Sequence, residues 1–283
     1  MRQHLSGVDH CFMLVRSLER ARRLYTQLGF TVSPLGRHSA NRGTGNHTIM
    51  LEHGYFELLG VLEQTPLSEK WLDALEKGEG LSSIALATDD ADAAVEELRA
   101  SGFKAQDAAS FSRPVSLPDG TYADARFRTA RFPEGTAPHV GLFCCRHETP
   151  EYVWLAPLLN HANSAYGIDC VIVTSDLPGQ DAQQLATVLD SATEELSDDA
   201  FYVDTGDQPV LYMTRNALSQ RYGGVDVSSL PRQGPAALSV KVHSVAMAAA
   251  CLRDAGVPYL TTRAGLVIAP QEACGVLLAF RST

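Results

Sequence analysis

The sequence has few of the features that mark secreted or membrane-bound proteins. Its 283 residues include six cysteines, and none of these belongs to a CxxC pair. A chain of this length does not need disulfides to fold, so we expect buried, reduced thiols. No stretch approaches the roughly 18 consecutive apolar residues of a membrane helix, and residues 1–14 lack the pattern of a signal peptide. These absences predict a cytoplasmic protein without a membrane partner.

Positive charge is also scarce. The chain has 23 Lys and Arg residues against 33 Asp and Glu residues, which gives a formal net charge of -10. A nucleic-acid-binding protein needs a basic face to displace counterions, so we expect no nucleic-acid partner. One local exception is a group of four arginines that lie close together in the sequence: Arg113, Arg126, Arg128 and Arg131. The overall composition, 45% hydrophobic and 20% charged, is that of an ordinary globular protein.

A unit of one strand, one helix and three further strands begins near the N-terminus. Residues 8–15 are rich in β-forming side chains. Ser17 then occupies the N-cap position of a helix with apolar residues at helical spacing, and Gly29 occupies the position after its end. Three extended runs complete a predicted βαβββ unit: 30–33, 47–51 and 55–61.

The same helix signals return twice at constant spacing. Asp90 and Gly102 lie 73 positions after the first cap and its glycine, and Ser244 and Gly256 lie 227 positions after them. Because each capping residue and its glycine are displaced by the same number of positions, the three helices are predicted to have equal length. A unit with its helix on one sheet face leaves the other face bare, so it must pair with a partner. We therefore predict an α+β fold of four βαβββ modules that pair into two curved-sheet domains.

The remaining module and the domain boundary are less regular. A predicted strand at 167–173 is followed by Asp176 at the expected cap position, but no clear glycine ends that helix. Proline and asparagine in 149–163 mark a linker. We accordingly predict an N-terminal domain at 1–148 and a degenerate C-terminal domain at 164–283. The sequence leaves open whether the first module pairs with the second or across the chain.

Several stretches resemble a known superfamily. DHCFMLV, QLGF and GYFELLG are similar to the first module of the vicinal-oxygen-chelate superfamily, which includes glyoxalases, bleomycin-resistance proteins and dioxygenases. FCCRHETPEYVW and HANSA further resemble a glyoxalase-like subfamily, and the similarity extends over nearly the whole chain. In this superfamily a metal ligand commonly comes from the first strand of a module and a Glu from its last strand. The resemblance implies the fold but not the reaction, because the superfamily includes lyases, isomerases, dioxygenases, epimerases and binding proteins.

His10 and Glu57 occupy these two ligand positions. His10 shares one side of its strand with Phe12, whereas Cys11 faces the other side. An unpaired carboxylate inside the apolar run GYFELLG is costly to bury, and a metal ion, a histidine or a substrate proton would relieve that cost. The alternatives are a hydrogen-bonded core histidine and a Glu at the solvent edge of the sheet. We predict His10 as a metal ligand and Glu57 as both ligand and catalytic proton shuttle.

The second module does not repeat these ligands. Ser83 lies at the position equivalent to His10, and the run HVGLFCCRH has no Glu. If the odd-numbered residues of this run point inward, Phe143, Cys145 and His147 line the pocket, and His147 becomes the third ligand. Two histidines and a carboxylate with open positions suit a divalent metal such as Fe, Mn or Zn, and Ni is also left open.

The loop GRHSANRGTGNH is placed to cover the mouth of the pocket. His38, Thr44 and Asn46 are predicted substrate-binding residues because their polar groups could meet substrate oxygens. Turn chemistry is the alternative explanation for the Asn and Gly residues. Arg42 in the same loop could pair with a substrate carboxylate.

The C-terminal half lacks an equivalent set of residues. Ala237 and Ala279 lie near the positions of His10 and Glu57, and Asp169 stands alone in the third module. We expect this half to be mainly structural, and the sequence leaves open whether it supplies a pocket wall or the surface of a homodimer.

The resemblance and the candidate ligands together favour an enzyme. We expect a divalent metal in the N-terminal cup that chelates adjacent oxygens of a small-molecule substrate. A metal-free binding protein of the bleomycin-resistance type is the main alternative. A metal-free epimerase or isomerase that uses His and Glu as acid and base is the third.

Overall fold

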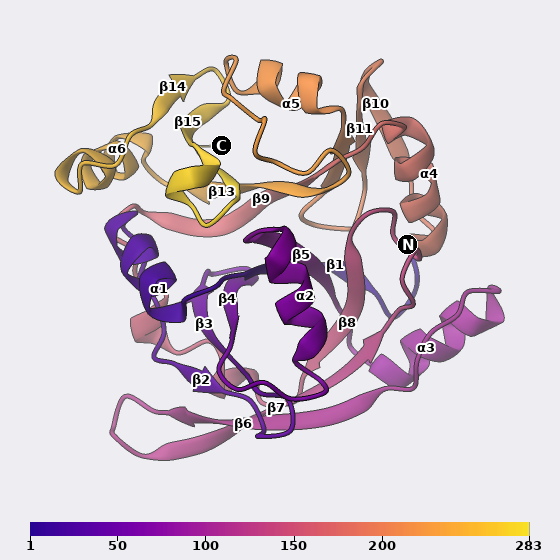
Figure 1. Cartoon of the computed structure of the whole chain (residues 1–283). Coiled ribbons are helices and arrows are strands. Elements are labelled where there is room, and N and C mark those ends of the chain that lie inside the picture. The colour runs from indigo at the N-terminus through magenta and orange to yellow at the C-terminus, as the bar shows by residue number, and fades with distance from the viewer. Residues whose placement is uncertain (283) are drawn as a thin grey trace.

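The computed structural model describes residues 1–282, which form an α+β fold with two curved eight-stranded sheets, one above the other in Figure 1. The first sheet has the strand order β2-β3-β4-β1-β5-β8-β7-β6, and the second has the matching order β10-β11-β12-β9-β13-β16-β15-β14. β1 pairs antiparallel with β5, and β9 pairs antiparallel with β13. The strands of the first two predicted modules therefore share one sheet, and those of the last two share the other.

The strands of the first sheet are β1 (Ser6–Leu14), β2 (Gly36–Arg37), β3 (Thr44–Met50), β4 (Tyr55–Val61), β5 (Gly80–Ala87), β6 (Ala109–Ser116), β7 (Tyr122–Arg131) and β8 (Gly141–His147). Those of the second are β9 (Ala165–Thr174), β10 (Thr193–Ser197), β11 (Ala200–Val203), β12 (Val210–Met213), β13 (Gly234–Val242), β14 (Leu260–Thr262), β15 (Gly265–Ile268) and β16 (Leu277–Arg281). The α-helices are α1 (Leu18–Gln27), α2 (Glu69–Lys77), α3 (Ala91–Ala100), α4 (Pro178–Leu189), α5 (Arg215–Arg221) and α6 (Val245–Asp254). Short 3-10 helices are η1 (Pro150–Tyr152), η2 (Ala156–Leu158) and η3 (Pro270–Glu272). No helix within residues 1–282 is long and apolar enough to cross a membrane.

Three helices begin and end as the capping pattern predicts. The side chains of Ser17, Asp90 and Ser244 each accept a hydrogen bond from a backbone N–H in the first turn of α1, α3 and α6. The glycine after each helix has a left-handed backbone: Gly29 (φ 89°), Gly102 (φ 86°) and Gly256 (φ 65°). Local sequence signals therefore set the limits of these helices.

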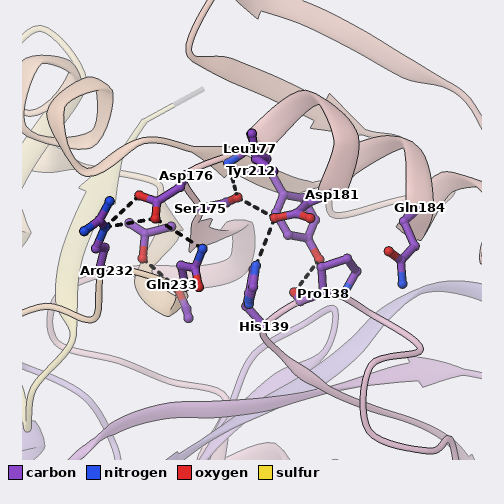
Figure 2. Close-up of polar contacts among 12 residues, drawn as sticks. Pro138, His139, Ser175, Asp176, Leu177, Asp181, Gln184, Tyr212, Arg232 and Gln233 are labelled. Carbon is purple, nitrogen blue, oxygen red and sulfur yellow. Dashed lines mark hydrogen bonds and ion pairs between the residues drawn. The ribbon is translucent and has the colours of Figure 1, made fainter.

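The predicted cap at Asp176 is wrong. α4 begins at Pro178, so Leu177 is the N-cap residue, and its N–H donates to the Ser175 hydroxyl at 2.8 Å. Asp176 instead pairs with Arg232 at 2.9 Å (Figure 2). The physical reason is that proline favours the first position of a helix, where its missing N–H is not needed.

The predicted strand at 30–33 is also absent. Residues 30–35 are irregular, and the short strand β2 forms only at Gly36–Arg37. Ser33 donates its N–H to Thr48 at 2.9 Å, but Pro34 has no N–H with which to extend the pairing. The ladder with β3 therefore starts beyond the proline.

The two sheets share one hydrophobic core on the faces opposite their concave sides. Cys11 and Ile84 of the first sheet belong to the same buried cluster as Val171 and Leu238 of the second, and β5 lies against β13. Polar contacts also join the halves beside α4 (Figure 2). Three of them are His139 Nε2 to Asp181 at 3.1 Å, Tyr212 OH to the Pro138 carbonyl at 3.0 Å, and Gln184 Nε2 to the Gly135 carbonyl at 2.8 Å.

The concave faces of the two sheets differ. In the second sheet, Leu218 of α5 and Tyr222, which follows that helix, pack with Val225. The same buried cluster includes the strand residues Ala237 and Ala279. Both alanines are fully buried. In the first sheet, a cavity remains on the concave side beneath α2.

Candidate functional site

The cavity of the first sheet has a volume of about 280 Å³. This lies near the small end of the range for ligand pockets. Five of the six residues predicted as metal ligands or substrate-binding groups line it: His10, His38, Thr44, Asn46 and Glu57. Six aromatic side chains also line it: Phe12, Tyr55, Trp71, Phe111, Phe127 and Phe143. Strands β1, β3, β4 and β8 thus bring the candidate residues to one face, as their alternation predicts.

His147, the sixth predicted residue, belongs to a buried group beside the cavity. One ligand atom from each of Asp9, His10, Cys145 and His147 lies within 4.8 Å of the others. Asp9 Oδ2 is 2.6 Å from His10 Nδ1 and 2.9 Å from His147 Nε2. Cys145 Sγ is 3.9 Å from His147 Nε2. The structure therefore brings His10 and His147 together, with Asp9 between them.

Asp9 was not predicted from the sequence because strand alternation directs it away from His10. In the β1–β5 ladder, Val8 pairs with Leu86 and His10 pairs with Ala85, so Asp9 is an extra residue in a β-bulge. A bulge changes the direction of a side chain relative to its neighbours. This bulge turns the Asp9 carboxylate toward the histidines. The only hint in the sequence is the adjacency of an acid and a histidine.

The Asp9 carboxylate is anionic at neutral pH. Burial alone would raise the pKa of Asp9, but the hydrogen bonds and charges of His10 and His147 outweigh this effect and lower its pKa well below the ordinary value. In this arrangement, His10 Nδ1 and His147 Nε2 donate to the carboxylate. The other ring nitrogen of His147, Nδ1, is buried without a hydrogen-bond partner in the described part of the chain. With Nε2 protonated, Nδ1 of the neutral ring carries a free lone pair.

Aromatic rings hold His147 in place. Its ring centroid lies 4.8 Å from that of Trp154, 5.2 Å from that of Phe127 and 5.8 Å from that of Tyr55. Trp154 lies in the predicted linker segment and is fixed by a hydrogen bond of 3.1 Å from its Nε1 to the Leu51 carbonyl. The linker segment therefore packs against the site.

Glu57 faces the same cavity but stands apart from this group. It is partly buried on β4, opposite Phe12 and Thr48 in the two ladders, and its side chain forms no hydrogen bond or ion pair within residues 1–282. Burial raises the pKa of Tyr55, and the negative charge of Glu57 raises it further. Glu57 is thus a free carboxylate in the cavity, and its role as a metal ligand stays a prediction.

The loop residues supply neutral polar groups at the cavity. His38 Nδ1 lies 2.8 Å from Thr44 Oγ1. Burial lowers the pKa of His38, and the positive charges of Arg42 and Arg113 lower it further, although Glu57 acts in the opposite direction. An uncharged imidazole and a hydroxyl are suitable hydrogen-bonding groups for substrate oxygens.

The donor set fits a divalent cation. Two imidazoles, a carboxylate and a thiol are ligands that Zn²⁺ accepts, and the two histidines with a carboxylate also suit Fe²⁺ or Mn²⁺. Burial raises the pKa of Cys145 well above its ordinary value, and the charges of Asp9 and Glu57 raise it further. A nearby metal ion would reverse this balance and favour the thiolate.

Comparisons with known proteins agree with this fold. Residues 8–189 match the family model described as a glyoxalase-like domain. The fold and the matched family define a protein of the vicinal-oxygen-chelate superfamily. Since the match covers more than half of the chain, this protein belongs to the glyoxalase-like domain family. A search of curated proteins found no match.

Several solved structures share the fold at low sequence identity. A hypothetical protein from Staphylococcus aureus is 14% identical, with 98% of this chain and 99% of that chain covered and a TM-score of 0.68. A mutant of 4-hydroxymandelate synthase from Streptomyces coelicolor is 14% identical, with 92% and 78% covered and a TM-score of 0.57. A Mn(II)-bound glyoxalase from Novosphingobium aromaticivorans is 13% identical, with 99% and 82% covered and a TM-score of 0.57. At this identity the similarity establishes the fold alone.

Proposed function

We propose that this protein is a metal-dependent enzyme of the glyoxalase or dioxygenase type that acts on a small oxygenated metabolite in the cavity of the first sheet. The observation that supports this most strongly is the Asp9 carboxylate, which holds His10 and His147 together beside that cavity. His10 and Cys145 belong both to this donor group and to the cavity lining. A metal ion held there would be adjacent to a bound substrate.

His10, His147 and Asp9 would hold the metal ion, with Cys145 as a fourth donor. The ring nitrogens that donate to Asp9 in the metal-free protein would lose their protons to become ligands. When bound, a divalent ion would polarise a substrate oxygen as a Lewis acid. The donor chemistry is compatible with Fe, Mn, Zn or Ni, so the identity of the metal must come from measurement. The Mn(II) ion of the Novosphingobium glyoxalase makes manganese one candidate.

The remaining chemistry belongs to the protein's own side chains. Glu57 is the general base in this proposal, because its carboxylate faces the cavity without a partner and can accept a proton from the bound substrate. His38, Thr44 and Asn46 orient the substrate through its oxygens. The aromatic walls exclude water from the proton transfer.

Metal analysis of variants tests this assignment. The purified protein is loaded with each candidate metal, desalted and analysed for bound metal. We expect His147→Ala to lose the metal, whereas Glu57→Gln keeps it and loses turnover of the substrate. A chelator should lower the melting temperature of the loaded wild type, because a ligand that binds only the folded state stabilises it. Equal metal content in wild type and His147→Ala would contradict the proposal.

A metal-free binding protein is the second candidate. It is favoured by the position of Glu57 outside the group of mutually close donors. In that case no candidate metal would remain with the desalted wild type, and chelator would leave the melting temperature unchanged. Turnover that persists in chelator would instead identify acid–base catalysis by Glu57 without a metal.

A further inference from the structure

Four cationic side chains line the cavity of the first sheet: Arg42, Lys70, Arg113 and Arg131. Glu57 is the one acidic side chain among the lining residues. The local charge is therefore opposite in sign to the formal net charge of the chain, which is -10. A concave site lined by charges of one sign concentrates ligands of the other sign.

None of these four cations has an acidic partner within residues 1–282. Other arginines on the surface do form ion pairs with carboxylates: Arg20, Arg22, Arg23, Arg99, Arg128, Arg232 and Arg281. The strand alternation of β7 explains part of this difference. Arg131 lies on the cavity side with Phe127 and Thr129, whereas Arg128 lies outside and pairs with Asp92.

Each cation instead lies near an aromatic ring of the cavity. The distances from the charged group to the ring centroid are 4.6 Å for Arg42 and Phe111, 4.7 Å for Lys70 and Trp71, 5.5 Å for Arg131 and Phe143, and 5.9 Å for Arg113 and Phe127. Such contacts orient a cation without cancelling its charge. The positive charges therefore remain available to a ligand.

Three of these cations are close enough to repel one another. Partial burial lowers the pKa of Lys70, and the charges of Arg131 and Arg42 lower it further. Burial likewise lowers the pKa of Arg131, and the charge of Arg42 lowers it further. Lys70 and Arg131 are exposed and Arg42 is partly exposed, whereas His10 and Cys145 are only 4% and 3% exposed. The three repelling cations thus lie toward the mouth of the cavity, and the candidate metal ligands lie at its inner end.

We propose that the substrates of this cavity carry an oxyanion, either a carboxylate or a phosphate, on a small planar apolar body. The oxyanion binds at the mouth between Arg42, Lys70 and Arg131, and the apolar body lies between the aromatic walls. Only the placement of the other end of the substrate, whose reacting oxygens face His10 and Glu57, rests on the proposed function. An oxyanion relieves the repulsion among the three cations and forms charge-assisted hydrogen bonds with them.

Binding of simple probes tests this proposal. Benzoate and phenyl phosphate carry the two kinds of oxyanion, and benzamide is a neutral molecule of similar shape. Titration calorimetry, with Trp71 fluorescence as a second signal, should show that one or both anions bind and that benzamide does not. Their relative affinities separate a carboxylate site from a phosphate site. The affinity should also fall as salt is added.

Matched variants locate the binding groups. Arg131→Gln and Lys70→Met should each weaken binding of the anion by about 10-fold or more, as expected for the loss of a charge-assisted hydrogen bond. Arg146→Gln and Lys104→Met remove exposed cations that do not line the cavity and should leave the affinity unchanged. The melting temperature of each variant confirms that it is folded. Failure of both anions to bind, equal binding of benzamide, or equal effects of cavity and control variants would overturn the proposal.

The same titrations separate this inference from the metal-dependent function. Anion binding that persists in chelator but is sensitive to Arg131→Gln supports the cation site whether or not the protein holds a metal. Anion binding that is abolished by chelator but unaffected by Arg131→Gln would mean that the metal binds the oxyanion. That result would refute the inference while supporting the proposed metal centre.

Discussion

Replacement of Asp9 by Asn tests whether one carboxylate holds the two histidines of the candidate centre. Asn has nearly the same size but no charge. Both imidazoles contact the same oxygen of Asp9, Oδ2, so an amide oxygen in that position can still accept from both. The substitution therefore turns two charge-assisted hydrogen bonds into weaker bonds between neutral groups.

The magnitude follows from the two contacts of 2.6 and 2.9 Å. A hydrogen bond to a charged group contributes about 1.5–3 kcal/mol, whereas one between neutral groups contributes about 0.5–1.5 kcal/mol. For two bonds, we therefore expect Asp9→Asn to lower the free energy of unfolding by about 2–3 kcal/mol. For a chain of this size, such a loss lowers the melting temperature by roughly 3–5 °C. Thermal and urea unfolding in chelator measure this effect without a contribution from bound metal.

An exposed pair supplies the matched control. Asp89 lies 3.0 Å from His4, but its side chain is 75% exposed. Water screens such a pair, so Asp89→Asn should unfold at the wild-type midpoint. If Asp9→Asn also unfolds at the wild-type midpoint, or if the two variants lose equal stability, Asp9 does not hold the histidines as we describe.

The pH dependence of this effect has a defined sign. Because folding lowers the pKa of Asp9, its contribution is fully present above the unfolded-state value, near 3.8, and is lost as the pH falls toward the folded-state value. The difference in midpoint between wild type and Asp9→Asn should therefore shrink as the pH falls below about 4. A difference that grows in acid would refute this reasoning.

Two further predictions concern the frame around the centre. Gly54 has a φ of 76°, and a Cβ there would lie 2.6 Å from the Asp9 carbonyl oxygen, so Gly54→Ala should lower both the melting temperature and the metal content. Gly102→Ala, also at positive φ but with nothing within 4 Å, is the control and should retain its metal in direct analysis. Tyr222→Ala should cost about 3–5 kcal/mol in urea unfolding, because it removes a fully buried ring from the second cup. Calorimetry should nevertheless show unchanged binding of anions by Tyr222→Ala, and altered binding would mean that the two cups are coupled.

The architecture could be predicted from the sequence wherever it depends on local signals. Ser17 and Gly29 mark the limits of α1, and the same kinds of residue mark α3 and α6. The errors arose where a proline changed the local structure. Pro178 moves the start of α4 past Asp176, and Pro34 delays the strand expected at 30–33.

The candidate site was predictable only where strands alternate regularly. His10, Glu57 and the residues of the 38–46 loop reach the cavity as period-two alternation and the loop position predict. Asp9 was missed because a bulge breaks that alternation. Lys70 was missed because α2 lies outside the repeated unit, and its approach to Arg131 depends on tertiary packing that no local pattern encodes.

The second cup shows which features of the first are not required by the fold. Both sheets have the same strand order, yet the second fills its concave side with apolar residues such as Leu218 and Tyr222. Since this topology forms around an apolar filling, it does not need buried histidines or an unpaired glutamate. Such groups reduce stability unless they are satisfied, because burial removes their hydration. In the first cup, the proposed metal ion and substrate would satisfy them.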